Sequence, residues 1–177
     1  MVSKGNRGVY SQHQQLDMPK YRHLTKDELD ALQKEFVEFL VVNGITADKW
    51  TAIKEHKKEA AEEIIAQFSD VVWESVLRKA KFLEHRSPQE IRTFQCLPDK
   101  IILMGLKIED ETIDLTTNEG FESVKEKTPK SKAYSTEKLY HKGREQEIFE
   151  LIQNGCIISD GKLFKSIALI LAESKSK

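Results

Sequence analysis

The feature that most constrains the fold is a change of hydrophobic period near residue 82. Between residues 26 and 79, apolar side chains recur at the three- and four-residue spacing of amphipathic helices. Between residues 93 and 115, short apolar and β-branched runs separated by turn residues indicate strands instead. Helices followed by a block of strands predict an α+β protein rather than an alternating α/β one.

Three helices are predicted before this change of period. Thr25 begins a capping box, and Asn43-Gly44 ends the first helix, which spans about residues 26–43. Thr46 opens a short second helix, and a third helix continues to about Lys79. Whether the second and third are one broken helix is left open.

Strand-like runs then follow one another closely. Ser87-Pro88-Gln89-Glu90 has the pattern of another capping box and predicts a single helical turn. The predicted strands are residues 93–97, 100–108 and 112–115, and their short gaps imply antiparallel hairpins. Residues 101–106 are apolar on both faces and are therefore expected in a central strand that the helices cover on one side.

The chain divides into four predicted parts. Residues 1–20 form a polar arm, and residues 21–115 form a core in which N-terminal helices pack on a small antiparallel sheet. Residues 116–138 lack a sustained apolar period and are expected to be a linker or mobile loop. Residues 139–174 form a C-terminal helical pair that packs on the core, joined through Cys156–Ile158 as a strand or a buried connector. Whether helix 162–173 is core or interface is left open.

Composition limits the classes of function. Hydrophobic residues make up 39% of the 177 residues, charged residues make up 32%, and the net charge is −1, so no global field points to nucleic acid or membrane. No apolar run approaches the roughly 20 residues that span a bilayer, and the polar N-terminus does not resemble a secretory signal. We expect a soluble cytoplasmic protein in which Cys96 and Cys156 are reduced thiols.

The densest chemistry lies where helical pattern gives way to strand pattern. His85 stands between Glu84 and Arg86, and Asp70 and Glu74 precede it on the third helix. A histidine beside carboxylates suits general acid–base catalysis. However, Asp70, Glu74 and Arg78 also follow one another at the i, i+4 spacing of surface ion pairs on a helix, and no nucleophile motif accompanies the group. A structural polar cluster is therefore favoured, and an enzyme centred on His85 is the alternative.

Neither a metal site nor a cofactor is predicted. His85, Cys96 and Cys156, with His23 or His141, have suitable ligand types but lack paired spacing such as CxxC or HxxxH. The phosphate-binding patterns GxxxxGK[ST] and GxGxxG are absent, as is the serine-hydrolase pattern GxSxG. The two cysteines are more simply explained as small apolar side chains of the core.

Basic residues interleaved with tyrosines in the arm and in residues 116–138 suggest a third hypothesis, RNA binding. Glutamates dilute the charge of the second segment, so a solvated linker is favoured there. The nucleic-acid-binding candidates are Lys4, Arg7, Lys20, Arg22, Lys127, Lys130 and Lys132.

Three stretches of the chain carry a resemblance: Leu24–Leu29 through Asn43–Trp50, Phe68–Glu74 through Phe82–Pro88, and Glu147–Ile152 through Asp160–Phe164. Together they resemble a small family of uncharacterised bacterial cytoplasmic proteins. The likeness covers most of residues 20–165. Because that family carries no established activity, cofactor or catalytic residue, the resemblance implies a bacterial cytoplasmic setting and transfers no site.

The leading functional hypothesis is a non-enzymatic interaction protein. The chain lacks a complete catalytic signature, and charged segments flank a modest core. We therefore expect an adaptor or regulator that docks on a protein or ribonucleoprotein partner. The sequence does not identify that partner or the oligomeric state.

Overall fold

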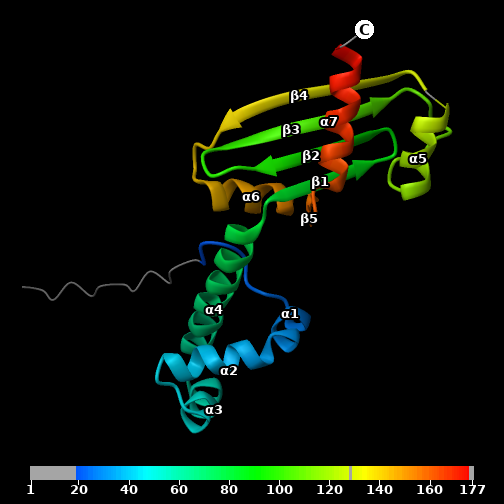
Figure 1. The fold of residues 1–177 in the computed structure, drawn as a ribbon. Coiled ribbons are helices and arrows are strands. Elements are labelled where there is room, and N and C mark those ends of the chain that lie inside the picture. Colours follow the sequence, from blue (N-terminus) through cyan, green and yellow to red (C-terminus); the bar gives the residue numbers. More distant parts are fainter. Residues whose placement is uncertain (1–18, 128, 176–177) are drawn as a thin grey trace, which may run out of the picture. The chain divides into compact units, whose positions relative to one another are not determined.

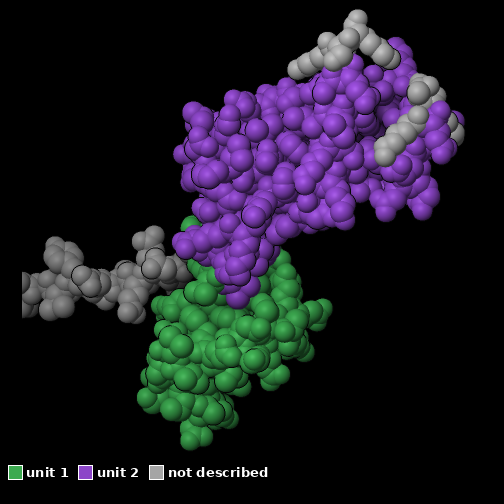
Figure 2. Space-filling model, viewed as in Figure 1, with its two compact units in different colours: residues 1–71 green, residues 72–177 purple. Residues whose placement is uncertain are grey.

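The computed structural model describes residues 19–127 and 129–175, apart from the side chains of Lys125, Lys127, Ser174 and Lys175 (Figure 1). The chain forms two compact units, residues 1–71 and 72–177, which Figure 2 distinguishes by colour. We describe each unit by itself. Within the described residues, no helix combines the length and apolar character needed to cross a membrane.

The first unit is helical and is built around a cluster of aromatic rings. The Phe36 and Phe68 ring centroids lie 5.0 Å apart, and Trp50 packs edge-on against Phe36 at 5.3 Å. Aromatic pairs at these distances and tilts add stability beyond their buried area. The helices are α1 (Lys26–Ala31), α2 (Gln33–Val42), α3 (Ala47–His56) and the first part of α4 (Lys58–Lys79).

The helix ends agree with the caps read from the sequence, but the predicted 26–43 helix is divided. The Thr25 capping box is present, and Asn43 is the C-cap of α2. Leu32 interrupts the helix with φ −108° and ψ 25°, so α1 and α2 are separate elements. A leucine carries no helix-breaking signal, which is why the periodic pattern did not show the break. Lys57, at φ −140°, separates α3 from α4.

The second unit contains a five-stranded antiparallel sheet in the order β4-β3-β2-β1-β5. The strands are β1 (Phe82–Ser87), β2 (Glu90–Cys96), β3 (Lys100–Ile108), β4 (Ser131–Leu139) and β5 (Ile157–Ser159). Its helices are α5 (Asn118–Lys127), α6 (Arg144–Gln153) and α7 (Lys162–Lys175), besides the end of α4. The predicted α+β class with a C-terminal helical pair is confirmed. That the N-terminal helices pack on the sheet stays a prediction.

One face of the sheet is covered by α7, which runs across the strands in Figure 1. Ile167 of α7 is fully buried with Ile91 of β2 and Leu106 of β3, and Phe121 of α5 joins the same cluster. The last helix is therefore part of the core on this side, while its Leu169 is exposed. Burial of such side chains contributes about 1.5–3 kcal/mol each.

The segment around Ser87 differs from its prediction. Residues 87–90 form a tight hairpin turn rather than a helical turn, because Ser87 pairs with Glu90 and its hydroxyl donates to the Glu90 carbonyl at 3.0 Å. Strand β1 was not predicted, since its central residues 84–86 are all charged or polar and hide the alternation. Residues 112–115 do not form a strand, because the Asp110 carboxylate accepts the Thr112 N–H at 2.9 Å and closes a local turn.

Residues 116–138 also differ from the predicted linker. They contain α5 and most of β4, and β4 pairs with β3 along its whole length. The strand lies at the edge of the sheet, where charged side chains are common because they discourage pairing with other chains. Because charged and polar residues occupy most positions of β4, its sequence lacks the apolar alternation from which a strand is predicted.

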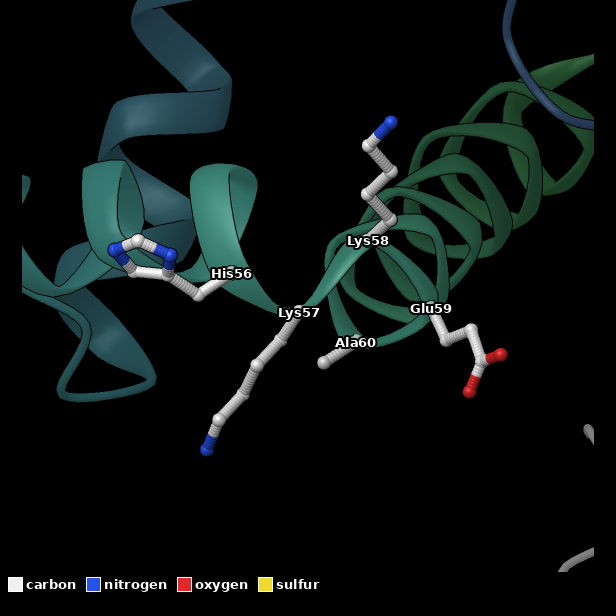
Figure 3. Close-up of a pocket in the computed structure, with 5 residues that line it drawn as sticks. All are labelled: His56, Lys57, Lys58, Glu59 and Ala60. Carbon is white, nitrogen blue, oxygen red and sulfur yellow. The ribbon is translucent and has the colours of Figure 1, made fainter.

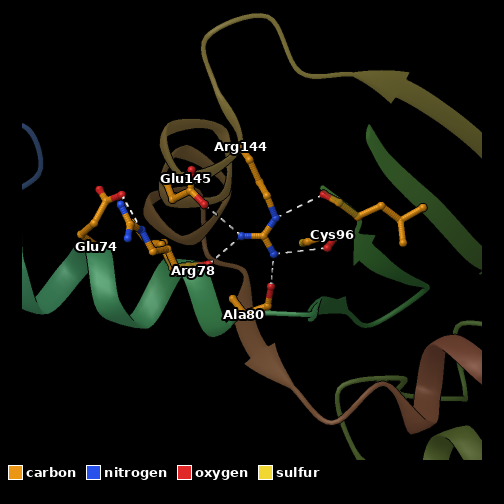
Figure 4. Close-up of polar contacts among 8 residues, drawn as sticks. Glu74, Arg78, Ala80, Cys96, Arg144 and Glu145 are labelled. Atoms are coloured by element: carbon orange, nitrogen blue, oxygen red, sulfur yellow. Dashed lines mark hydrogen bonds and ion pairs between the residues drawn. The ribbon is translucent and has the colours of Figure 1, made fainter. Parts of the chain in front are cut away.

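Arg144 connects α6 to the end of α4 and the end of β2 (Figure 4). Its guanidinium donates to the carbonyls of Leu97 at 3.2 Å, Leu77 at 2.9 Å and Cys96 at 3.2 Å, and also to that of Ala80. The side chain is only 15% exposed. Carbonyls at a helix C-terminus lack helical partners and carry partial negative charge, so a buried cation both satisfies and stabilises them.

Glu147 fixes the connection between β4 and α6. Its carboxylate accepts from Lys138 Nζ at 2.6 Å, from the Lys142 N–H at 3.1 Å and from the His141 N–H. Burial would raise the pKa of Glu147, but the hydrogen bonds from Lys138 and the two amides outweigh it and lower the pKa to about 2. The ionised form is therefore the one that the fold requires.

The first prediction concerns Arg144. Replacing it with alanine removes the donor from the buried carbonyls of Ala80 and Cys96, so we expect the free energy of unfolding to fall by about 3 kcal/mol or more. Urea unfolding measures this through Trp73, which packs on Phe149 with ring centroids 5.1 Å apart, in a Trp50→Phe background.

Arg78→Ala is the matched control, because it removes an exposed arginine from an ion pair with Glu74 at 3.0 Å. Such a pair contributes about 0.5 kcal/mol. Equal losses in the two variants would contradict the role assigned to Arg144.

The second prediction concerns pH. Because the pKa of Glu147 is lower in the folded state, its stabilisation is complete above about pH 4.5 and is lost as the pH falls towards about 2. Glu147→Gln should cost about 2–3 kcal/mol at pH 7, and the difference from the unmodified protein should shrink below about pH 4.5. Urea midpoints at a series of pH values test this; a difference that does not change with pH would refute it.

Candidate functional site

The pleat of β1 separates the charged triplet that the sequence singled out. Glu84 and Arg86 point to the face covered by α7 and form an ion pair at 3.3 Å. Arg86 also donates to the Asn118 side chain at 3.0 Å. His85 points to the opposite face. The three residues therefore do not form one cluster, and a joint acid–base role for them stays a prediction.

The two carboxylates predicted to support His85 have structural partners. Asp70 accepts the backbone N–H groups of Lys20 at 2.9 Å and Tyr21 at 3.0 Å, within the first unit. Glu74 accepts from Arg78 Nε at 3.0 Å along α4, as drawn in Figure 4. The Glu74–Arg78 pair is the one that helical spacing indicated, whereas Asp70 holds the backbone of a distant segment, which the spacing did not indicate.

The residues that do lie beside His85 come from neighbouring strands. Strand register places His85 opposite Arg92, Arg92 opposite Gly105, and Gly105 opposite Tyr134. Across four strands these side chains share the face that α7 does not cover. A Cβ added to Gly155, just before β5, would lie 3.4 Å from the His85 ring, so this glycine borders the same row.

Polar contacts connect the row. Arg92 Nη2 lies 3.4 Å from His85 Nδ1, and Arg92 Nε lies 3.8 Å from the Glu90 carboxylate. The Tyr134 hydroxyl donates to the same carboxylate at 2.8 Å. The Arg92 side chain is nevertheless 45% exposed. We call His85, Glu90, Arg92 and Tyr134 the sheet-face cluster.

Tyr134 owes its position to Gly105. A Cβ at residue 105 would overlap Cζ, Cε1 and the hydroxyl of Tyr134, so the ring lies directly over the glycine. From β4 the ring crosses β3 and reaches Glu90 on β2. Burial, together with the hydrogen bond and charge of Glu90, raises the pKa of Tyr134 to about 12. The phenol therefore stays protonated and donates to Glu90.

Two lysines extend this face beyond the cluster. Lys107 and Lys132 lie directly opposite each other on β3 and β4, two residues along from Gly105 and Tyr134, and both are exposed. Like charges that face each other across strands are destabilising. Three cations thus gather near one carboxylate, Glu90. We call the sheet-face cluster with Lys107 and Lys132 the open sheet face.

Of the basic residues predicted to bind nucleic acid, Lys4 and Arg7 lie outside the described residues, as does the side chain of Lys127. Lys20 belongs to the first unit, where its Nζ lies 4.9 Å from the centroid of the Tyr21 ring. The structure therefore does not place Lys20 on a common basic surface with the other three residues.

The other three candidates differ among themselves. Arg22 donates through both terminal nitrogens to the Glu28 carboxylate, each at 2.7 Å. Lys130 pairs with Glu109 at 2.8 Å. Lys132, in contrast, belongs to the open sheet face and has no ion pair among the described residues.

The predicted metal candidates are not brought together. Both cysteines are buried free thiols, and burial raises the pKa of Cys96 to about 11 and also raises that of Cys156. Within the part of the chain that the structure describes, no three His, Cys, Asp or Glu side chains gather closely enough to hold a metal ion. His141 serves instead through its backbone N–H, which donates to Glu147.

A hollow at the junction of α3 and α4 is lined by His56–Ala60 (Figure 3). In Figure 3 the side chains of His56, Lys57, Lys58 and Glu59 point in different directions rather than towards a common centre. All four side chains are also exposed, so they do not form a preorganised ligand-binding site.

Sequence reasoning missed Arg92, Glu90, Gly105 and Lys107. The only available signal was the spacing of two between Glu90 and Arg92 and between Lys132 and Tyr134, which places each pair on one face of a strand. With β4 predicted as a linker, nothing showed that these pairs belong to the same face.

The third prediction tests the position of Tyr134. Gly105→Ala should displace the ring and break its hydrogen bond to Glu90, which costs about 1 kcal/mol. The pKa of the Tyr134 phenol should then fall from about 12 towards the ordinary value near 10. Ultraviolet titration, with Tyr134→Phe subtracted, measures the change; an unchanged pKa would show that the ring does not depend on Gly105.

Comparison with known proteins gives a family but no individual relative. No curated protein and no solved structure matches the chain. A family model described as a family of unknown function, DUF6495, matches residues 18–172. This span covers the elements from α1 through the sheet and most of α7. The chain therefore belongs to the DUF6495 family of unknown function.

Proposed function

We propose that the protein is a non-enzymatic interaction protein whose binding surface is the open sheet face. The observation that carries this proposal is the side-by-side placement of exposed cations and a half-buried aromatic ring on the face opposite α7. Exposed aromatic and arginine side chains are the residue types that dominate binding energy at interfaces. Their positions on paired strands make the surface rigid, which lowers the entropy lost on binding.

The same geometry favours binding over catalysis. The nearest polar contact of His85 on its own face is Arg92, a permanent cation that cannot act as a general base. Glu90, the carboxylate of this face, accepts from Tyr134 and lies beside Arg92. The thiol of Cys156 has a raised pKa, which disfavours the nucleophilic thiolate. These groups support one another and offer charge and aromatic surface to a partner.

The setting we propose is the bacterial cytoplasm. The resemblance described from the sequence supports it. The two free, buried thiols, Cys96 and Cys156, support it as well, because a reducing compartment keeps cysteines in this state.

The fourth prediction tests whether this face meets a partner in cells. A photo-crosslinking amino acid at position 107 should give discrete adducts in the full chain. Arg92→Glu with Lys132→Glu should abolish them, because the charge of the face is reversed. Adducts are detected by gel shift and classified by their sensitivity to ribonuclease and to protease.

Lys26→Glu with Lys165→Glu is the matched control, since it makes the same change of net charge at exposed positions of α1 and α7. We expect the control to keep the adducts. Adducts that persist in the open-face variant, or that disappear equally in both, would remove the proposed function.

A further inference from the structure

We propose that the open sheet face binds single-stranded RNA, with one base stacked on Tyr134 and adjacent phosphates held by Arg92, Lys107 and Lys132. This inference rests on the proposed function and names its partner.

The tyrosine provides a prepared stacking surface. One side of the ring covers Gly105, so the ring lies flat along the sheet and its other side is directed away from the strands. The hydrogen bond from its hydroxyl to Glu90 fixes the rotation of the ring before any ligand arrives. A base that stacks on such a ring gains about 1–3 kcal/mol, and little entropy is lost in ordering the side chain.

The charges around the ring suit a polyanion. Lys107 and Lys132 face each other in register, with Glu90 opposite Lys107 on its other side, and a phosphate lying over the two lysines would relieve the repulsion that remains between them. Arg92 presents a guanidinium that is 45% exposed and can donate to phosphate oxygens as a fork. The chain as a whole carries a net charge of −1, so this positive surface is local.

Protection of a sheet edge does not account for these cations. Lysine on an edge strand discourages aggregation, and Lys132 on β4 fits that explanation. Lys107 and Arg92, however, lie on β3 and β2, which are interior strands. Their charges project from the face of the sheet and not from its edge, which favours a ligand that lies across the strands.

A single strand fits the face better than a duplex. Readout of a duplex requires a helix or ribbon that enters a groove, whereas this surface is the face of a sheet. The bases of a duplex also stack on each other, so their faces are closed to Tyr134, whereas an unpaired base can stack on an aromatic side chain. In the cytoplasmic setting proposed above, the abundant single strand is RNA.

The fifth prediction is a binding measurement on the full chain. The probe is a fluorescent single-stranded RNA of mixed sequence and about 12 nucleotides, followed by anisotropy. With three phosphate contacts, the slope of log K against log salt should be about −2, which weakens binding about 20-fold between about 50 and 200 mM KCl. Tyr134→Ala should weaken binding about tenfold or more, whereas Tyr134→Phe, which keeps the ring, should stay within about threefold of the unmodified protein.

Charge variants separate this face from other basic surfaces. Lys107→Glu with Lys132→Glu should weaken binding and bring the slope to about −0.7, whereas Lys26→Glu with Lys165→Glu should keep the slope near −2. Circular dichroism checks that each variant is folded. If Tyr134→Ala does not fold, the exposed lysine pair still decides the outcome.

The results that would contradict RNA binding differ from those that would contradict an interaction function. Absent or salt-insensitive binding, equal loss in both lysine pairs, or tighter binding of the duplex or of single-stranded DNA of the same sequence would overturn the RNA assignment. Protease-sensitive, ribonuclease-resistant adducts at position 107 would leave the interaction function standing with a protein partner. Loss of both the adducts and RNA binding would remove both proposals.

Discussion

The second unit depends on a buried arginine that donates to four main-chain oxygens outside its own helix, besides the side chain of Glu145. Arg144 meets the carbonyls at the end of α4 and at the end of β2, while it begins α6. Each of these ends would otherwise bury unsatisfied acceptors, at a cost of about 1–3 kcal/mol apiece. One side chain thus sets where the helix stops, where the strand stops and where the chain turns back.

The sequence predicted the features that local chemistry decides. The Thr25 capping box, the Asn43-Gly44 helix end and the bounds of β3 follow from short-range patterns, and the structure confirms them. It did not predict β1 and β4, because strands whose exposed positions carry charge lose the alternation on which strand prediction relies. Their identity comes from pairing with β2 and β3, which is a long-range property.

In the candidate site, too, local sequence did not show which residues long-range strand pairing brings together. His85 was singled out together with Glu84 and Arg86, but these neighbours in sequence point to the opposite face of β1. Its neighbour on the same face is Arg92, 7 positions further along the chain, which strand register places opposite it. Arg144 is a further case, since nothing in the sequence marked this arginine as a residue whose side chain is only 15% exposed.

The contact between Gly105 and Tyr134 ties two distant positions of this chain together. Because a side chain at position 105 and the Tyr134 ring in its present place cannot occupy the same volume, the two positions are not free to change independently. A larger residue at position 105 requires the ring to move or a smaller residue to replace it. The smallest side chain of the sheet thus decides whether its face displays an aromatic surface at this point.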